Sequence, residues 1–213
     1  MTNQCNGFID HSIDPDDLDE EQESSSDPRT GTIAAHFRAI LSELNLDTSE
    51  PNLAGTPDRL ARMYLDLFSG LQEGTRPVLR TFPNREHYNQ IVSIRDIPFY
   101  SMCSHHFLPF FGEAHVAYLP GDRIVGLSKL ARVVEFYARR PQVQERLTEQ
   151  IINCVADELR PRGAMVVMQG RHMCMEMRGV KKPGSVTTTS AIRGVFQDRS
   201  VREEFLQLML KRS

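Results

Sequence analysis

The spacing of apolar residues changes along this chain of 213 residues, and these changes constrain the fold more than any other feature. Before about residue 70 the apolar side chains recur at three- and four-residue steps, as in Ile33, Phe37 and Leu41, which predicts helices. The spacing then becomes two in the segments 91–96 and 113–118, which predicts strands. A helical spacing returns between Leu130 and Leu159. The chain therefore contains both helices and strands in separate blocks.

The complete order of expected elements follows from the same spacing and from capping residues. A second helix is expected from Thr56, as N-cap before Pro57, to Gly70. After the first two strands come a helix capped by Ser128 and another across 143–159. Strands are then expected at 164–168 and 171–180, and a last helix at 201–209. This order predicts an α+β fold with a mainly antiparallel sheet.

Charge and composition divide the chain unevenly. Residues 1–30 carry nine acidic residues and one basic residue, which leaves 19 acidic and 24 basic residues, a net charge of about +5, for the rest. We expect a disordered acidic tail at 1–29, a helical segment at 30–88 and a catalytic domain at 89–213. The mild positive charge suits an anionic small substrate, and no basic run predicts nucleic-acid binding. The absence of a long apolar run predicts no membrane association, and irregularly spaced cysteines favour a reducing, cytoplasmic location.

Two segments offer the side chains of a metal site. Cys103 and His106 are separated by two residues at the end of an expected strand, and zinc accepts both thiolate and imidazole. Read as a strand, 171–178 places three methionines on one face and His172, Cys174, Glu176 and Arg178 on the other. Two cysteines and one histidine would leave a fourth position open for water, as in catalytic zinc sites.

The histidines beside these ligands are candidates for proton transfer. Because neighbouring side chains diverge in an extended chain, we expect only one of His105 and His106 to bind metal, which leaves His105 and His172 to move protons. Two alternatives stay open at this level. The cysteines could be small buried apolar residues with surface histidines, or they could belong to a closed structural zinc site with four protein ligands.

Two helix starts carry residues that suit a nucleotide. Ser128, Lys129 and Arg132 open one helix and could form an anion site, although on spacing alone a capped helix with solvated bases is the simpler explanation. Glu145, in the first turn of the next helix, could accept the N1–H and 2-amino donors of guanine. An acidic residue that merely favours a helix N-terminus is the alternative for Glu145. The hydroxyl run at 187–190 predicts a strand or turn without assignable chemistry.

Together these segments resemble the GTP cyclohydrolase I family over about residues 52–210. The resemblance lies in Gly55–Ala61, Met102–Phe111, Gly126–Arg132, Arg139–Thr148, His172–Cys174, Arg178–Val180 and Thr188–Ser190. The run that contains Gln142-Val143-Gln144-Glu145-Arg146 is the most specific of them. Two positions depart from the family pattern: Arg62 stands where lysine is common, and Ser104 stands where many relatives have glutamate.

The resemblance implies a fold, a site and a reaction. The fold would be the tunnelling fold, a four-stranded antiparallel sheet with two helices on one face, whose subunits form a barrel and a homodecamer. Zn²⁺ would be held by Cys103, His106 and Cys174, with His105 and His172 as catalytic residues. The GTP-binding residues would be Arg62, Ser128, Lys129, Arg132, Gln144, Glu145 and Arg178.

The implied reaction is hydrolysis and rearrangement of GTP to 7,8-dihydroneopterin triphosphate with release of formate, the first step of pterin synthesis for folate or tetrahydrobiopterin. Active sites would lie between subunits, and regulation by an allosteric effector or a partner protein would be compatible with the family. Two rivals remain: a nitrile reductase of the same fold with a cysteine nucleophile, and a catalytically dead relative. The metal-ligand set disfavours the first, and the retained histidines disfavour the second.

Overall fold

A computed structural model describes residues 27–210 apart from residue 73. The expected acidic tail at 1–29 lies almost entirely outside the described residues. The chain divides into two compact units between Ala61 and Arg62. The first contains α1 (Arg29–Glu43), α2 (Pro51–Ala54) and the start of α3 (Thr56–Leu67). The helical spacing predicts α1 and α3 but not the four-residue α2. Among the described residues, no helix is long and apolar enough to cross a membrane.

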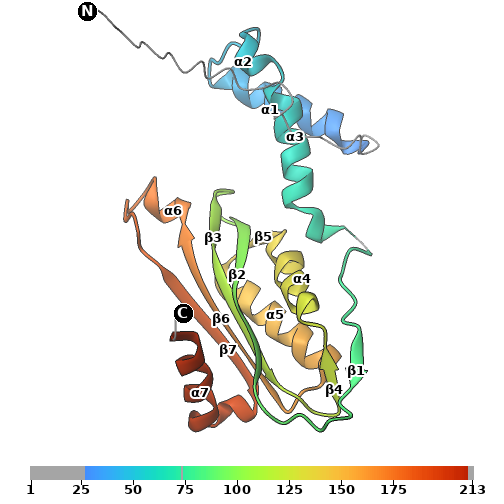
Figure 1. The fold of residues 1–213 in the computed structure, drawn as a ribbon. Helices are drawn as coiled ribbons and strands as arrows, with labels where there is room; N and C mark the ends of the chain where they lie inside the picture. Colours follow the sequence, from blue (N-terminus) through green and yellow to red (C-terminus); the bar gives the residue numbers. More distant parts are fainter. Residues whose placement is uncertain (1–26, 73, 211–213) are drawn as a thin grey trace, which may run out of the picture. The chain divides into compact units, whose positions relative to one another are not determined.

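The second unit is built on one main sheet with the order β5-β2-β3-β6-β7 (Figure 1). Its four long strands are β2 (Val92–Cys103), β3 (Pro109–Leu119), β6 (Gly163–His172) and β7 (Thr187–Gly194), and each pairs antiparallel with its neighbour. The two-residue β5 (Pro141–Gln142) adds to β2 in parallel. A small separate sheet joins β1 (Thr81–Pro83) to β4 (Arg123–Val125). The predicted α+β class with a mainly antiparallel sheet is confirmed.

Each face of the main sheet is covered by different helices. On one face, α4 (Leu127–Ala138) and α5 (Gln144–Leu159) bury the larger core, because alternate residues of the strands, such as Val116 and Val166, point towards them. On the other face, Ala117, Met165 and Val167 pack with the 3-10 helix η3 (Val195–Gln197) and with α7 (Arg199–Leu210). Figure 1 shows α7 beside β7. Two helices therefore share one face, and a third covers part of the opposite face.

The strand predicted at 171–180 is wrong beyond His172. The short helix α6 (Met173–Glu176) follows β6, and the amide of Met177 donates to the carbonyl of Met173 at 3.0 Å. The pairing of β6 ends at Phe110 on one side and at Thr187 on the other, so later residues have no neighbouring strand. Methionine and glutamate are strong helix formers, and the unpaired chain coils. The predicted apolar methionine face is lost with the strand, since Met177 is 64% exposed.

Two predicted helix starts also differ from the structure. Gly126, not Ser128, is the N-cap of α4, and no side-chain hydrogen bond caps this helix. Helix α3 begins at Thr56 itself, and the Thr56 hydroxyl donates to the carbonyl of Asn52 instead of capping. In contrast, the hydroxyl run at 187–190 is the first half of β7. The boundary expected at residue 88 stays a prediction.

Candidate metal centre and active site

Cys103 stands at the point where β2 leaves the sheet. Its amide donates to the carbonyl of Leu108 at 2.9 Å, and the next amide, of Ser104, donates to the carbonyl of Gln142 on β5 at 2.8 Å. These bonds fix the turn that carries the two histidines. The Nδ1 atoms of His105 and His106 lie 4.0 and 3.8 Å from the Cys103 sulfur. The two rings nevertheless diverge, with their planes 83° apart and their centroids 6.2 Å apart, and of the two only His106 belongs to the group that could hold a metal ion, as predicted.

The second cysteine reaches the same place from α6. One ligand atom each from Cys103, His106 and Cys174 lies within 4.8 Å of the other two. Cys103 is buried, Cys174 is half-buried and His106 is exposed. Desolvation, and next the hydrogen bond with the Cys103 thiol, raise the pKa of the Cys174 thiol. The structure thus brings together the three ligands predicted from the sequence.

A pair of charged side chains holds the turn that carries Cys174. The guanidinium of Arg171, the penultimate residue of β6, donates from Nε and an Nη atom to both oxygens of Glu176, at 2.8 and 2.6 Å. The Glu176 side chain is 7% exposed and the Arg171 side chain is 47% exposed. This bond to Arg171 is the main cause that lowers the pKa of Glu176. The pair ties α6 to the end of β6, and a bidentate geometry of this kind is specific in direction.

The donor set fits zinc. Tetrahedral zinc with bonds of about 2.3 Å to sulfur and about 2.0 Å to nitrogen separates a sulfur from a nitrogen ligand by roughly 3.6 Å. The observed separation of the Cys103 sulfur and the Nδ1 of His106 is 3.8 Å. The nearby Cys103 thiol helps to raise the pKa of the Cys174 thiol, so ionisation of this pair is disfavoured. A divalent cation bound between the two sulfurs would stabilise their thiolate forms. Three protein ligands are the number found in catalytic zinc sites.

His172 lies at the last residue of β6, two residues before Cys174. Its ring stacks on Phe110 with the centroids 4.6 Å apart and the planes 4° from parallel. Its Nε2 lies 2.9 Å from the Oε1 of Gln144, at the start of α5. Burial lowers the pKa of His172, and the charge of Glu145 opposes that shift. An imidazole fixed by Phe110 and Gln144, whose neutral form is favoured by burial, therefore stands beside the candidate metal ligands, with Glu145 near enough to influence it.

Residues Gln144 and Glu145 are neighbours in the chain but have different surroundings. Glu145 is exposed in the first turn of α5 and can reach a ligand. Gln144 is 1% exposed, and its side-chain amide bonds to groups of β6 and β7. Only Glu145 of this pair presents its side chain outwards.

The predicted phosphate-binding residues lie at the other end of the sheet. Ser128 follows β4, where the amide of Val125 donates to the hydroxyl of Tyr118 near the end of β3. The candidate metal ligands lie at the opposite end of β3, where Met102 pairs with Pro109. Because a strand rises about 3.3 Å per residue, the length of β3 puts these ends roughly 30 Å apart. One subunit therefore does not bring Ser128 to its own metal centre.

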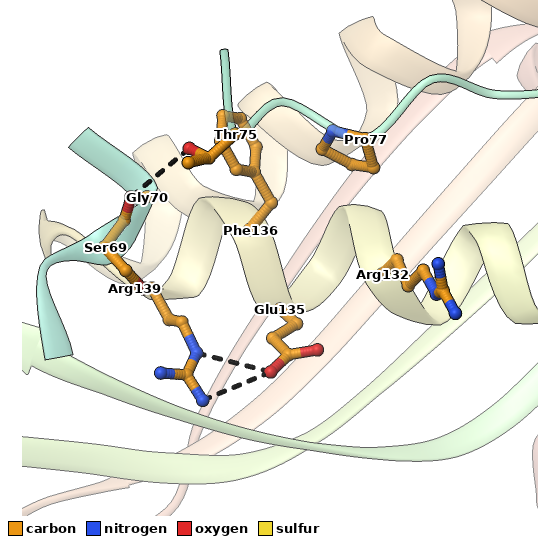
Figure 2. A pocket seen from close by; sticks show the side chains of 8 residues that line it. All are labelled: Ser69, Gly70, Thr75, Pro77, Arg132, Glu135, Phe136 and Arg139. Atoms are coloured by element: carbon orange, nitrogen blue, oxygen red, sulfur yellow. Dashed lines mark hydrogen bonds and ion pairs between the residues drawn. The ribbon is translucent and has the colours of Figure 1, made fainter. Parts of the chain in front are cut away.

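Arg132 lines a pocket of about 420 Å³ on the exposed side of α4 (Figure 2). Arg139 lies at the other end of this pocket and is neutralised by Glu135 and Asp66. Within the described part of the chain, neither Lys129 nor Arg132 forms an ion pair. These two cations are therefore available to an anionic ligand.

The other predicted site residues have simpler positions. His105 is exposed in the turn after Cys103, and Arg178 is exposed just after α6, where its charge acts on Cys174. Arg62 lies on α3. Neither the stacking of Phe110 on His172 nor the Arg171–Glu176 pair was predicted from the sequence. In a strand, residues five apart point to opposite faces, so the sequence does not predict a contact between Arg171 and Glu176. The contact forms because α6 turns the chain back towards the end of β6.

A cluster of two cysteines and one histidine, flanked by a fixed imidazole on an antiparallel α+β sheet, forms a candidate metal centre with the number of protein ligands that catalytic sites use. Comparison with known proteins gives the particular group. Residues 33–210 match GTP cyclohydrolase I as a family, and the chain belongs to that family.

Several curated relatives are similar over most of their length. GTP cyclohydrolase 1 of Geobacillus kaustophilus is 52% identical over 81% of this chain and 92% of its own. The protein of the same name from Bacteroides fragilis is 46% identical over 90% of this chain and 99% of its own length. The protein from Carboxydothermus hydrogenoformans is 53% identical over 77% of this chain and 85% of its own length. The solved structure of apo archaeosine synthase QueF-Like is 18% identical with a TM-score of 0.40, covering 49% of this chain and 93% of that chain, which is too distant to carry an argument.

Proposed function

We propose that this protein is a zinc-dependent GTP cyclohydrolase I, which converts GTP and water to 7,8-dihydroneopterin triphosphate and formate, the first step of pterin synthesis. The observation that carries the proposal is the convergence of Cys103, His106 and Cys174 beside His172, in a chain of this family. Neither a purely apolar role for the cysteines nor a surface role for the histidines explains why these groups meet.

Cys103, His106 and Cys174 would hold the zinc ion. When bound, zinc with an open ligand position supplies a Lewis acid that activates water for attack on C8 of the purine. A fourth protein ligand would close that position. Among the described residues, the group of metal-binding atoms at this place contains three residues, which supports the open arrangement.

His172 and His105 would move the protons. Addition of water at C8 requires protonation of the departing ring nitrogen, which breaks the C8–N bond and leaves a formamide. A second water then releases C8 as formate, and a proton at the ribose ring oxygen opens the sugar. An Amadori rearrangement and ring closure with loss of one water complete the product. A neutral imidazole can accept the proton that the attacking water gives up and then donate it to the departing nitrogen or to the ribose oxygen, and burial favours the neutral form of His172 before that step.

Glu145 would accept the N1–H and 2-amino donors of guanine, because it is exposed and close to His172. Arg178 and Arg62 would add positive charge for the triphosphate. Ser128, Lys129 and Arg132 would complete its binding from a second subunit, since their own metal centre lies at the far end of the sheet. The placement of these three residues supports an active site shared between subunits.

Assembly into a ring, and into the decamer of two stacked rings, is part of the proposal. Within the described residues, β7 has a partner along one side only, and β2 has only β5 beside its last two residues on its outer side. Both edges therefore expose backbone donors and acceptors that another copy could pair with. In such an assembly, Ser128 and Cys103 of one active site would come from different subunits.

The proposed activity is tested by incubating the purified protein with GTP and measuring products. We expect formate and 7,8-dihydroneopterin triphosphate in equal amounts, the second detected by its fluorescence after oxidation. His172→Ala should abolish the complete reaction without changing the metal content, because His172 is not a ligand. Release of phosphate from GTP without formate would contradict the proposal.

A further inference from the structure

Gln144 is a fully buried polar side chain whose hydrogen bonds all lie inside the subunit. Its Nε2 lies 3.2 Å from the carbonyl oxygen of Met168, 3.0 Å from that of Thr187 and 3.1 Å from the hydroxyl of Thr189. Carbonyl oxygens only accept hydrogen bonds, so the NH₂ group must face them. The orientation of the amide is therefore determined by its surroundings.

The hydroxyl groups around Gln144 confirm this orientation independently. The hydroxyl of Thr148 lies 2.8 Å from the backbone carbonyl of Gln144 and must use its single proton there. The hydroxyls of Thr148 and Thr189 are 2.7 Å apart, so Thr189 must be the donor of that pair. Because the Thr189 hydroxyl donates its only proton to Thr148, its oxygen can only accept a hydrogen bond from the amide of Gln144. Both hydroxyl protons are thereby assigned, and the three acceptors around the two N–H groups of Gln144 leave no place for its amide oxygen on this side.

The remaining end of the amide, Oε1, faces His172. It lies 2.9 Å from Nε2 of the imidazole, and an amide oxygen can only accept. Whenever the imidazole carries a single proton, that proton must therefore be on Nε2, which leaves the lone pair on Nδ1. The ring cannot easily turn away from this arrangement because it stacks flat on Phe110. Orientation of an imidazole by the bond at its second nitrogen is a general way of fixing its tautomer.

Gly170 on β6 makes space for this bond. A methyl group built on Gly170 would stand 2.6 Å from the Oε1 of Gln144 and 3.3 Å from the ring of Phe99. The nearest obstacle is the far end of a flexible side chain, so an alanine there would displace the amide oxygen while the backbone could stay. The absence of a side chain at Gly170 therefore leaves the space in which Gln144 Oε1 contacts His172.

We propose that Gln144, supported by Thr148 and Thr189, is a positioning residue that holds His172 in its Nε2–H tautomer, so that Nδ1 is the atom that exchanges protons with the substrate. The inference deepens the proposed function, since it rests on the role of His172 in that reaction. It gives Gln144 a role towards a protein side chain and leaves the recognition of guanine to Glu145.

The tautomer can be observed directly by long-range ¹H–¹⁵N NMR of protein labelled with ¹⁵N-histidine, without any turnover. We expect His172 in the wild-type protein to carry its proton on Nε2. Gln144→Met removes the acceptor and Gly170→Ala displaces it, so both variants should show a mixture or the Nδ1–H form. Gln142→Met is the matched control, because Gln142 is equally buried and its side chain bonds to Tyr137, Gln150 and Arg146 instead. It should leave the His172 signal unchanged.

Kinetics on the same proteins give the second readout. With GTP, Gln144→Met should lose about 10- to 100-fold in kcat with KM changed by less than about 2-fold, as expected for a residue that orients a reacting group. An Nδ1–H proton in the wild-type protein, an unchanged tautomer in both variants, or an unchanged kcat would overturn the inference. If the wild-type protein does not turn over GTP, the proposed function fails, and the NMR result still decides the tautomer.

Discussion

Replacing Glu145 with glutamine separates a residue that recognises guanine from one that only favours a helix start. The substitution keeps the shape of the side chain but changes one carboxylate oxygen into an NH₂ donor. One of the two guanine donors would then face another donor. Glu145 is exposed in the first turn of α5, so the fold itself depends little on its charge.

The expected loss can be estimated from the two bonds. A hydrogen bond to a charged group contributes about 1.5–3 kcal/mol, and an unpaired donor left in the complex costs about 1–3 kcal/mol more. At about 1.4 kcal/mol for each factor of ten, kcat/KM for GTP should fall roughly 10²- to 10⁴-fold. A residue that only interacts with the helix dipole would change stability by about 0.3–1 kcal/mol and leave the kinetics near normal.

Steady-state kinetics, metal analysis and thermal unfolding should be measured on Glu145→Gln and on Glu149→Gln. Glu149 lies one turn further along the same helix, where it pairs with Arg193, so it controls for the loss of a surface carboxylate. We expect a large kinetic defect in the first variant alone, with zinc content unchanged in both. Equal and near-normal kcat/KM values would refute the assignment of Glu145.

Three further outcomes are expected. A protein that starts at Thr30 should turn over GTP at the wild-type rate, because residues 1–29 carry none of the predicted site residues; loss of turnover would give the tail a role in assembly or catalysis. Burial lowers the pKa of His115, so the unfolded chain binds protons more readily than the folded one, and stability should decrease as pH falls below about 6.5. His115→Gln should make that decrease shallower in urea titrations at several pH values, and an unchanged slope would contradict the assignment. Arg171→Ala should weaken zinc binding by about 10- to 100-fold, because it releases the turn that carries Cys174, and unchanged affinity in a metal competition assay would exclude this support.

The sequence predicted the sheet and its helices because periodic burial determines them. Leu147, Ile151, Val155 and Leu159 recur at one helical face and are buried as expected. The same reasoning failed at 171–180, where the alternation of methionines with polar residues is genuine but no neighbouring strand exists to use it. Local spacing does not show where the neighbouring strands end. β6 stops where its pairing with β3 and β7 stops, and those pairings join residues that are distant in sequence.

The candidate site was predicted as a set of residues but not as a geometry. Cys103, His106 and Cys174 were identified from residue type and family resemblance, and the structure brings them together. Their arrangement depends on a turn and a short helix that the sequence analysis treated as extended chain. Gln144 shows the same limit, since its partners Thr187 and Thr189 are more than forty residues away in sequence. The separation of Ser128 from the metal ligands required the complete topology.

The most direct test of the account is the joint measurement of metal and turnover in one preparation. The protein should be analysed for zinc per subunit and for formate released from GTP in three states: as purified, after exhaustive chelation, and after zinc is returned. Cys174→Ser should be measured in parallel, with circular dichroism to verify its fold. We predict one zinc per subunit, loss of formate release on chelation, its recovery with zinc, and a folded but metal-free and inactive Cys174→Ser. Full activity in the chelated protein, or in a variant without bound metal, would contradict the central claim.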